Sequence, residues 1–464
     1  MTKNVNLAYI GGGSKEWARV FMSDLALAEG LSGEIRLYDI DLPAAQRNQA
    51  IGGHINRDPK TRSVFQYKVC PEIEEALTGA DFVIISILPG TFREMRSDVH
   101  APEKYGIYQS VGDTAGPGGV LRAMRTLPIY EGFARKIKEC CPQAWVLNLT
   151  NPMSACVKAL YDEFPQIKAF GCCHEVFHAQ EFLTCVLKEL KGIEVGREDI
   201  YTDASGVNHF TWITQARYRD IDLLSLLPEF MEKFYDEGYC EHPGKDRFAF
   251  RTDPFAYGNK VKMDLFRRYG ALAAAGDRHL VEFLPGGWYL KDPETVKEWL
   301  FNLTTVDFRE ERQEERIAES MELAQGRKPF VLEKSQEEVV EILKALMGFH
   351  TLVTNVNLPN VGQMPQMPLG SIVETNCVFA HGMAKPVVSV PLPAGACDLV
   401  RRCCGNIDTL CQGIRRRDMD EIFASFVNQA LCGGLRREEA EALFREMCEN
   451  TRDYLEPYFD LKGR

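Results

Sequence analysis

The chain has 464 residues, of which 45% are hydrophobic and 26% are charged, and its formal net charge is −12 at pH 7. This composition is typical of a globular protein, and the acidic balance disfavours general binding to nucleic acid or to anionic membranes. No apolar run reaches the roughly 18 residues that a membrane span needs, and the N-terminus lacks the pattern of a signal peptide. The 15 cysteines, an odd number, fit reduced thiols. We therefore expect a cytoplasmic protein with neither nucleic-acid nor membrane partners.

Short apolar segments alternate with amphipathic ones over the first 170 residues. We expect buried strands at residues 4–10, 34–40, 81–87, 144–150 and 168–173. Helix-like segments, such as 16–30 and 119–140, lie between them, and this alternation predicts βαβ units and a parallel sheet. The prediction is an α/β fold with a Rossmann-like, doubly wound parallel sheet in residues 1–175.

The pattern changes after residue 175, where we expect one mixed α+β substrate domain over residues 176–464. Residues 245–290 look helical with Gly and Pro interruptions, and a charged helix is expected at about 307–326. Residues 352–395, rich in Asn, Pro, Gly and Val, predict loops and short strands, and the last 65 residues predict helices.

The segment YIGGGSKEW, residues 9–17, is a glycine-rich turn between the first strand and the first helix. Such a turn lets the backbone approach a pyrophosphate at a helix N-terminus, although Glu16 occupies the usual third glycine position. Asp39 ends the second strand, where an acid can bind a ribose hydroxyl. The pattern also fits a tight turn with a solvent-facing acid. We expect this turn to contribute four cofactor-binding residues: Gly11, Gly12, Gly13 and Ser14.

Two further segments end predicted strands and can face a cofactor. Ser86 begins SILPG, and Asn148 precedes the TNP triplet at residues 150–152. Pro-Gly and Asn-Pro are also ordinary turn formers, so turn chemistry alone explains them equally well. The Gly-rich loop at 111–128 opens a helix, and its backbone amides could bind an anion.

Metal-ligand residue types crowd GCCHEVFH, residues 171–178, and a histidine occurs in SGVNHFTW, residues 205–212. A soft thiolate from Cys173 and an imidazole from His209 could bind a transition metal and leave positions open for a substrate. The alternative is a buried free cysteine and a hydrogen-bonded core histidine. The segment at 273–285 adds Asp277, Arg278, His279 and Glu282, which also fit a charged helix end.

Taken in order, the motifs GGGS, DID, GDTAGPGG, LTNP, GCCHE and VNHFTW resemble those of glycoside hydrolase family 4. The resemblance runs from residue 5 to about 380 and includes the Asn-rich block at 355–374. Members are NAD- and divalent-metal-dependent glycosidases, whose N-terminal fold is like that of lactate and malate dehydrogenases. The resemblance therefore implies NAD and a divalent metal, usually Mn²⁺, as cofactors.

The mechanism that the resemblance implies is an exception to the two-carboxylate glycosidases. NAD⁺ takes a hydride from C3 of the sugar, a base removes the acidified C2 proton, and the leaving group departs by elimination. Water then adds, and the hydride returns, so there is no net redox change. The metal chelates O2 and O3 and stabilises the enediolate as a Lewis acid.

Several residues match the motifs of this family. Cys173 and His209 match its metal ligands, and Asn151 matches the sugar-binding asparagine of TNP. Asn208, beside His209, is expected to touch sugar or metal. His174 stands where phospho-α-glucosidases place an acid for the leaving group, and it is our candidate general acid.

The CHEV form at residues 173–176 resembles the α-galacturonidase branch, with α-glucuronidases as nearest neighbours, and we place Glu175 at the substrate. A uronate carries a carboxylate at C6, and burying that charge requires a cation, preferably a bidentate arginine. Arg93, Arg251 and Arg278 are candidates between which the sequence does not choose.

The chain departs from the family where many members place a tyrosine just after a glycine as the C2 base. Here Tyr269 precedes Gly270. Tyr269, Asp277 or a metal-bound water therefore stay open as the base.

The resulting hypothesis is a homodimeric or homotetrameric α-galacturonidase that acts on small α-galacturonides. One alternative is an α-glucuronidase, α-glucosidase or α-galactosidase with the same machinery. Two alternatives belong to other classes: an NAD-dependent hydroxy-acid dehydrogenase and a non-catalytic NAD-binding regulator.

Overall fold

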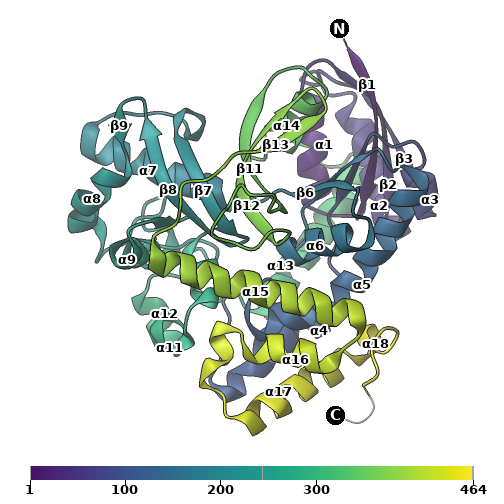
Figure 1. Ribbon diagram of the computed structural model, residues 1–464. Coiled ribbons are helices and arrows are strands. Elements are labelled where there is room, and N and C mark those ends of the chain that lie inside the picture. Colours follow the sequence, from purple (N-terminus) through teal and green to yellow (C-terminus); the bar gives the residue numbers. More distant parts are fainter. Residues whose placement is uncertain (1, 243, 462–464) are drawn as a thin grey trace.

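A computed structural model describes residues 2–242 and 244–461 and contains one mixed sheet. Its parallel strands are β1 (Lys3–Ile10), β2 (Leu31–Tyr38), β3 (Phe65–Val69), β4 (Phe82–Ile85), β5 (Trp145–Asn148) and β6 (Lys168–Gly171). Its other strands are β7 (Tyr201–Val207), β8 (Phe210–Tyr218), β9 (Ile221–Asp222), β10 (Leu272–Ala273), β11 (Leu352–Pro359), β12 (Ile372–Ala380) and β13 (Met383–Pro386). The order across the sheet is β10-β8-β7-β12-β11-β6-β5-β4-β1-β2-β3, with β13 beside β12 and β9 beside β8 (Figure 1).

The parallel part has the strand order of a doubly wound dinucleotide-binding sheet, so the predicted fold class is confirmed. All five expected strands are present within a few residues of their predicted bounds. The edge strand β3 is not among the predicted strands, because FQYKV is short and lacks the continuous apolar run that marks the buried parallel strands.

The two sequence halves share the sheet. β11, from the second half, pairs antiparallel with β6 where Asn357 lies opposite Gly171, and β12 pairs antiparallel with both β11 and β7. The division of the chain at residue 175 stays a prediction.

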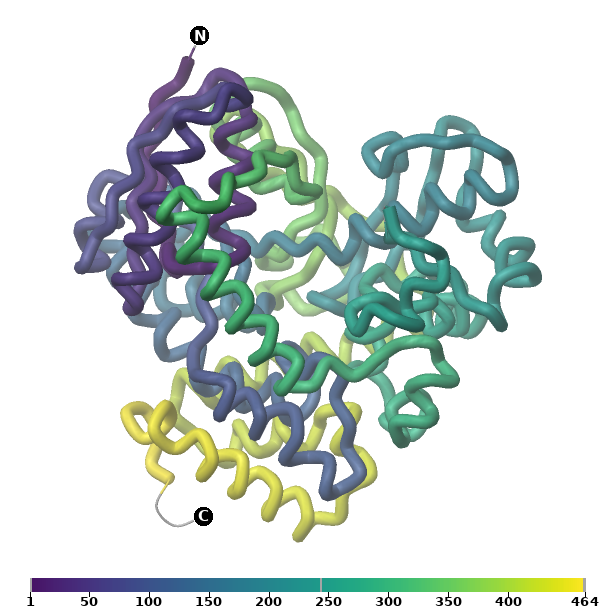
Figure 2. The backbone as a smooth tube through the Cα atoms, turned by 180° about the vertical axis from the view of Figure 1, so that it is seen from behind, coloured from purple at the N-terminus to yellow at the C-terminus, as the bar shows by residue number. Residues whose placement is uncertain are grey.

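Helices cover both faces of the parallel part. One face packs against α1 (Trp17–Leu27), α2 (Leu42–Ile55), α13 (Val306–Ala324) and α14 (Val339–Leu346). The other packs against α3 (Ile73–Leu77), α5 (Gly116–Cys140) and α6 (Met153–Glu163). The expected charged helix is α13, which lies beside α2 and α4 (Phe92–His100) and crosses the back of the molecule obliquely (Figure 2).

A second layer consists of the helices that the last 65 residues predicted. They are α15 (Ala394–Arg416), α16 (Met419–Val427), α17 (Arg437–Asn450) and α18 (Arg452–Leu455). They pack against α5 and α6 on the side away from the sheet (Figure 1). None of the helices in the described part of the chain has the length and apolarity to cross a membrane.

The antiparallel part carries its own apolar cluster and helices. The helices that contribute to this cluster are α7 (Glu175–Lys191), α8 (Leu227–Phe234) and α9 (Lys260–Tyr269). The short helices α10 (Asp277–Leu280), α11 (Gly286–Tyr289) and α12 (Pro293–Glu298) follow, and their buried residues join the main core. The segments between them bring residues 208–209 and 276–282 to the ends of β5 and β6. All 15 cysteines are free thiols.

Candidate active site

The glycine turn after β1 has room only for glycine. Gly11 has φ +94°, and a Cβ there would overlap the carbonyl oxygen of Ser86. A Cβ on Gly12 would collide with the backbone of Leu37. Gly13 donates its amide to Asp39 Oδ2 over 2.8 Å, which ties the turn to the end of β2. This close approach of backbone segments fits the phosphate turn of a dinucleotide-binding fold.

The other predicted cofactor residues lie around this turn. Ser14 Oγ accepts the amides of Glu16 and Ala18 at 3.4 Å at the start of α1. Asn148 is fully buried, and its amide is occupied: Oδ1 accepts from Tyr130 Oη at 2.6 Å, and Nδ2 donates to the Thr150 carbonyl at 3.0 Å. Asn148 therefore shapes the TNP turn, and any role toward the cofactor is through that turn.

A three-donor group lies beside the ends of β5 and β6. Asp113, His209 and His279 offer ligand atoms within 4.8 Å of one another, and the two imidazole centroids are 4.2 Å apart. Thr114 Oγ1 donates to Asp113 Oδ1 at 2.7 Å and lies 3.3 Å from His209 Nδ1. One carboxylate and two imidazoles are a donor set for a divalent transition metal.

The protonation states of this group suit a metal. Burial opposes the charge of Asp113, but Arg122 and the two histidines hold the pKa of its carboxyl far below the ordinary value. Burial and the neighbouring His279 lower the pKa of His209 to about 3. A carboxylate and a neutral imidazole are the forms that bind metals.

Cys173 is buried near this group but is not a member of any three-donor set formed by the described residues. Its thiol lies beside Asn208 and in the field of Glu374 and Glu175. Burial, followed by these two carboxylates, raises the pKa of the Cys173 thiol well above its ordinary value. A thiolate at this position therefore needs a nearby cation, which a bound divalent metal would supply.

Two predicted asparagines leave polar atoms without partners. Asn151 Nδ2 donates to Asp113 Oδ2 at 3.3 Å, while its Oδ1 is buried and has no hydrogen bond within the described residues. Both amide atoms of Asn208 are likewise buried without a hydrogen bond there. Orphaned buried groups at this edge of the sheet are what a polyhydroxylated ligand would satisfy.

His174, at the start of α7, lies between the glycine turn and the metal-ligand residues. Its ring stacks on Trp17 of α1 with centroids 5.7 Å apart, and its Nδ1 is 3.1 Å from Glu337 Oε1. Burial disfavours the imidazolium, but the contact with Glu337 and the field of Glu175 raise the pKa of His174 to about 9. Glu175 accepts the Gly276 amide at 2.7 Å and lies 3.5 Å from His279 Nε2.

The three candidate arginines occupy different environments. Arg278 is 8% exposed, and its Nε has no hydrogen-bond partner in the described structure, although its Nη2 donates to Thr304. The side chain of Arg93 is 71% exposed and lies 3.7 Å from Asp453. Arg251 is exposed and stacks on Phe248. Only Arg278 of the three is buried among site residues.

The two candidate bases lie in different surroundings. Tyr269 is half-buried and packs against Trp212, with ring centroids 5.6 Å apart. Asp277 is fully buried, and its oxygens accept the amides of Val261 at 3.1 Å and Lys262 at 2.9 Å, the first turn of α9. Burial raises the pKa of Asp277 to about 7.

The structure adds three site residues that the sequence did not single out, Asp113, Tyr257 and Glu337, and it places His279, named only as part of the segment at 273–285, in the metal-ligand group. The Tyr257 hydroxyl donates to Glu241 Oε1 at 2.9 Å, and its ring contacts Gly276 next to the candidate site. Five of the nine histidines form two sets of ring contacts around this region: His178 contacts His174 and His242, and His209 contacts His279. Asp113 and His279 lie inside quoted motifs, and their spacing alone did not distinguish them.

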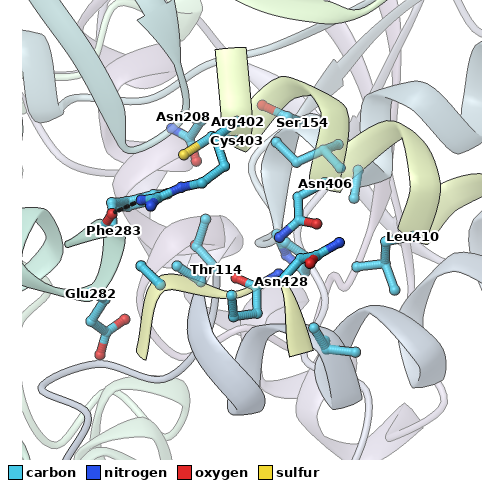
Figure 3. A pocket seen from close by; sticks show the side chains of 17 residues that line it. Thr114, Ser154, Asn208, Glu282, Phe283, Arg402, Cys403, Asn406, Leu410 and Asn428 are labelled. Carbon is cyan, nitrogen blue, oxygen red and sulfur yellow. Dashed lines mark hydrogen bonds between the residues drawn. The ribbon is translucent and has the colours of Figure 1, made fainter. Parts of the chain in front are cut away.

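A small hollow lies next to the metal-ligand group, because its lining includes Thr114 and Asn208, the chain neighbours of Asp113 and His209 (Figure 3). Its lining includes Thr114, Ser154 and Asn208, and α15 contributes Arg402 and Asn406. Arg402 donates to the Phe283 carbonyl at 2.7 Å across its rim. The hollow therefore reaches the orphaned amide of Asn208.

Known proteins share both the sequence and the architecture. The model of the family 4 glycosyl hydrolases matches residues 6–189, and that of their C-terminal domain matches residues 204–432. An α-galacturonidase of Thermoanaerobacterium saccharolyticum is 51% identical over 454 residues, covering 98% of this chain and 97% of the relative.

Solved structures of other proteins share the architecture of this chain. The crystal structure of the lplD protein of Bacillus subtilis superposes with a TM-score of 0.90 at 45% identity and covers 96% of this chain and 100% of that one. A 6-phospho-α-glucosidase from gut microorganisms, in complex with NAD and Mn²⁺, shares the fold with a TM-score of 0.78 at 19% identity, covering 99% of this chain and 100% of that one. The resemblance read from the motifs is confirmed: the chain belongs to glycoside hydrolase family 4.

Proposed function

We propose that this protein is an α-galacturonidase that uses NAD and a divalent metal, with Mn²⁺ as the preferred ion. The observation that carries the proposal is the 51% identity, over nearly the whole of both chains, to a relative named α-galacturonidase. Relatives named α-galactosidase and α-glucosidase match at only 25–27%.

The residues of this site fit both cofactors. The turn at Gly11–Gly13, with Asp39, has the shape for NAD, and Asp113, His209 and His279 with the thiol of Cys173 offer donors for a metal. When bound, NAD supplies reversible hydride transfer and the metal supplies Lewis-acid stabilisation of negative charge on the sugar oxygens.

The remaining polar groups of the site would orient the sugar. Asn151 Oδ1, which Asp113 orients through Nδ2, is proposed to accept a sugar hydroxyl. Arg278 is proposed to bind the C6 carboxylate through its unpartnered Nε, because a buried guanidinium is the group best suited to a buried carboxylate. Glu175, whose carboxylate accepts the Gly276 amide, is proposed to accept a further sugar hydroxyl.

Proton transfers need an acid and a base. His174 is proposed as the acid for the leaving group, because Glu337 holds its Nδ1 and leaves Nε2 directed toward Glu175. Tyr257 is proposed as the C2 base, because its ring lies beside Gly276 at the site and its hydroxyl is held in place by a hydrogen bond to the buried carboxylate of Glu241. Tyr269 packs on Trp212 and Asp277 holds α9, so neither has a comparable acceptor.

The first experiment is hydrolysis of p-nitrophenyl α-D-galacturonide with and without NAD⁺ and Mn²⁺. We expect turnover that needs both, with no net NADH. Faster turnover of a glucuronide or neutral glycoside would overturn the substrate assignment but keep the mechanism. Steady NADH accumulation would favour a hydroxy-acid dehydrogenase, and turnover without either cofactor would contradict the proposed chemistry.

The carboxylate anchor has its own test. Arg278→Met should raise KM for the galacturonide much more than for the matching galactoside, since only the former carries the C6 charge. Arg251→Met is the control, because Arg251 is exposed and stacks on Phe248, and it should leave KM for both substrates unchanged. An equal rise in KM for both substrates would indicate that Arg278 maintains the folded site and does not bind the carboxylate.

The base assignment is tested by Tyr257→Phe, with Tyr269→Phe as the matched variant. Loss of a positioned base costs roughly 10²–10⁴-fold in rate, and we expect that loss only for Tyr257→Phe. In D₂O, uptake of deuterium at C2 of the product should fall in parallel. The reverse pattern would return the role to Tyr269.

We further propose a homo-oligomer, cytoplasmic in location. Val361, Leu369 and Val388 are 74%, 76% and 66% exposed and lie in adjoining loops, joined by the Gly370–Asn360 and Ser389–Gln363 backbone hydrogen bonds. An exposed apolar patch of this kind favours self-association. Analytical ultracentrifugation of the wild type and of Val361→Asp tests this self-association. We expect a dimer or tetramer for the wild type and weaker association for the variant.

A further inference from the structure

A second group of metal-ligand side chains lies next to the candidate site. His178 of α7, with Glu241 and His242 of the segment before α9, offers three ligand atoms within 4.8 Å of one another. The two imidazole centroids are 5.1 Å apart, with the rings nearly perpendicular. None of these residues belongs to the group of Asp113, His209 and His279.

The carboxylate of Glu241 is buried without a compensating cation. Its side chain is 4% exposed, and within the described residues no Lys, Arg or His nitrogen forms an ion pair with it. The ammonium of Lys262 lies over the rings of Phe182 and Tyr257, the tyrosine that donates to Glu241, and it forms no ion pair with Glu241 itself. Buried charges in proteins are paired or coordinate a metal. Glu241 has no ion-pair partner among the described residues, so a bound cation would supply the missing positive charge.

The neighbouring Glu175 does not share this deficit. It accepts the Gly276 amide at 2.7 Å, and imidazole nitrogens of His279 and His174 lie at 3.5 and 3.8 Å. His178 also stands within reach of Glu175 and His174. The uncompensated charge of Glu241 makes the set with His242 the better cation site.

Further contacts orient the three donors. Glu181, itself 6% exposed, lies 3.3 Å from His178 Nδ1, which leaves Nε2 as the free nitrogen. Tyr257 Oη donates to Glu241 Oε1 at 2.9 Å and Asn259 Nδ2 to Oε2 at 2.5 Å, so each oxygen keeps a lone pair. A carboxylate behind a metal-binding histidine, and hydrogen bonds to a ligating carboxylate, are the usual supports of metal ligands.

We propose that His178, Glu241 and His242 bind a second divalent transition metal, such as Zn²⁺ or Co²⁺. Two imidazoles and one carboxylate form the donor set of such ions, and a fourth position is left for water. The ion would join the segment 239–259 to α7 and hold Tyr257 through Glu241. The inference concerns ion binding and does not depend on which glycoside is hydrolysed.

The test is titration of the full-length, metal-free protein with Co²⁺ alone, followed by its visible d–d absorption and by metal analysis after gel filtration. We expect two ions per chain for the wild type and one for the His178→Ala/His242→Ala variant. Glu181→Gln should still bind the second ion, but with roughly 10–100-fold lower affinity. His350→Ala removes a histidine from a surface His–Glu pair and should bind two ions like the wild type.

A readout independent of activity separates ion binding from folding. His242→Asn retains a polar side chain, and without metal this variant should have the same Tm as the wild type. Co²⁺ should then raise the Tm of the wild type more than that of His242→Asn. Equal stoichiometry and equal Tm shifts in the wild type and the variants would overturn the proposal.

Discussion

Asp113 links side chains from several elements in the metal-ligand region. Its carboxylate lies with His209 and His279, accepts a hydrogen bond from Thr114 and orients Asn151. The sequence placed it inside a glycine-rich loop, where its role could not be separated from an anion-binding turn. Its importance follows from contacts across the fold rather than from local spacing.

Asp113→Asn should weaken metal binding by at least the roughly 10–100-fold that loss of an outer-shell partner costs, because it removes the negative charge of a direct ligand. The measurement is the Mn²⁺ concentration for half-maximal activity, together with direct Mn²⁺ binding by equilibrium dialysis. Asp220→Asn, at an exposed position after β8, is the control. An unchanged Mn²⁺ requirement in Asp113→Asn would move the metal away from this group.

Gly11→Ala should destabilise the protein by about 1–3 kcal/mol, since its φ of +94° is strained for a side chain and a Cβ would overlap Ser86. Urea unfolding without NAD measures this change in the free energy of unfolding. Gly53→Ala is the opposite control: it lies inside α2 with open space around its Cα, and we expect stabilisation by about 0.5–1 kcal/mol. Equal effects of the two substitutions would contradict this explanation.

At the scale of elements, α9 begins in the interior and needs an acceptor for its first amides. Asp277 supplies it from outside the helix, by accepting the amides of Val261 and Lys262. The sequence suggested this residue as a base, but the contacts describe an anchor that fixes α9.

Asp277→Asn should therefore cost about 1–3 kcal/mol of stability, because one buried amide loses its acceptor, while turnover of the folded protein persists. Urea unfolding and kcat below the transition measure the two effects. Asp292→Asn, at the N-cap of α12, is the matched surface change and should be nearly neutral. Loss of kcat without loss of stability would restore Asp277 as the base.

The elements that the sequence predicted well are those whose signal is local. The parallel strands are continuous apolar runs, and α13 and the C-terminal helices have helical periodicity. Pairing of β11 with β6 joins residues far apart in the chain, and no local pattern specifies it. Likewise Tyr257 and Tyr269 both precede a glycine, and only packing around α9 places the first beside Glu241.

At the scale of the whole molecule, a buried carboxyl links the loop at 111–112 to the segment after α10. Glu282 is 2% exposed and accepts the amides of Val111 at 2.7 Å and Gly112 at 2.9 Å. Burial outweighs these hydrogen bonds and raises the pKa of Glu282 to about 7. The folded state therefore holds a proton that the unfolded state releases near the ordinary pKa.

Because the folded state binds more protons between the two values, this carboxyl makes stability fall as pH rises from about 4.5 through about 7. Glu282→Gln keeps an oxygen acceptor and removes that titration. Between pH 5 and 8 the wild type should lose about 2.5 kcal/mol more unfolding free energy than the variant. Urea unfolding at both pH values measures it, and parallel pH profiles would contradict the assignment.

The shared sheet has a consequence for synthesis of the chain. β6 is complete early, but its partner on one side, β11, leaves the ribosome only after all of α7 to α14. Until then the emerging N-terminal part presents an open strand edge, the kind of surface that pairs with other chains. Nascent chains arrested before residue 352 should therefore recruit chaperones or aggregate, and arrest beyond β12 should relieve both.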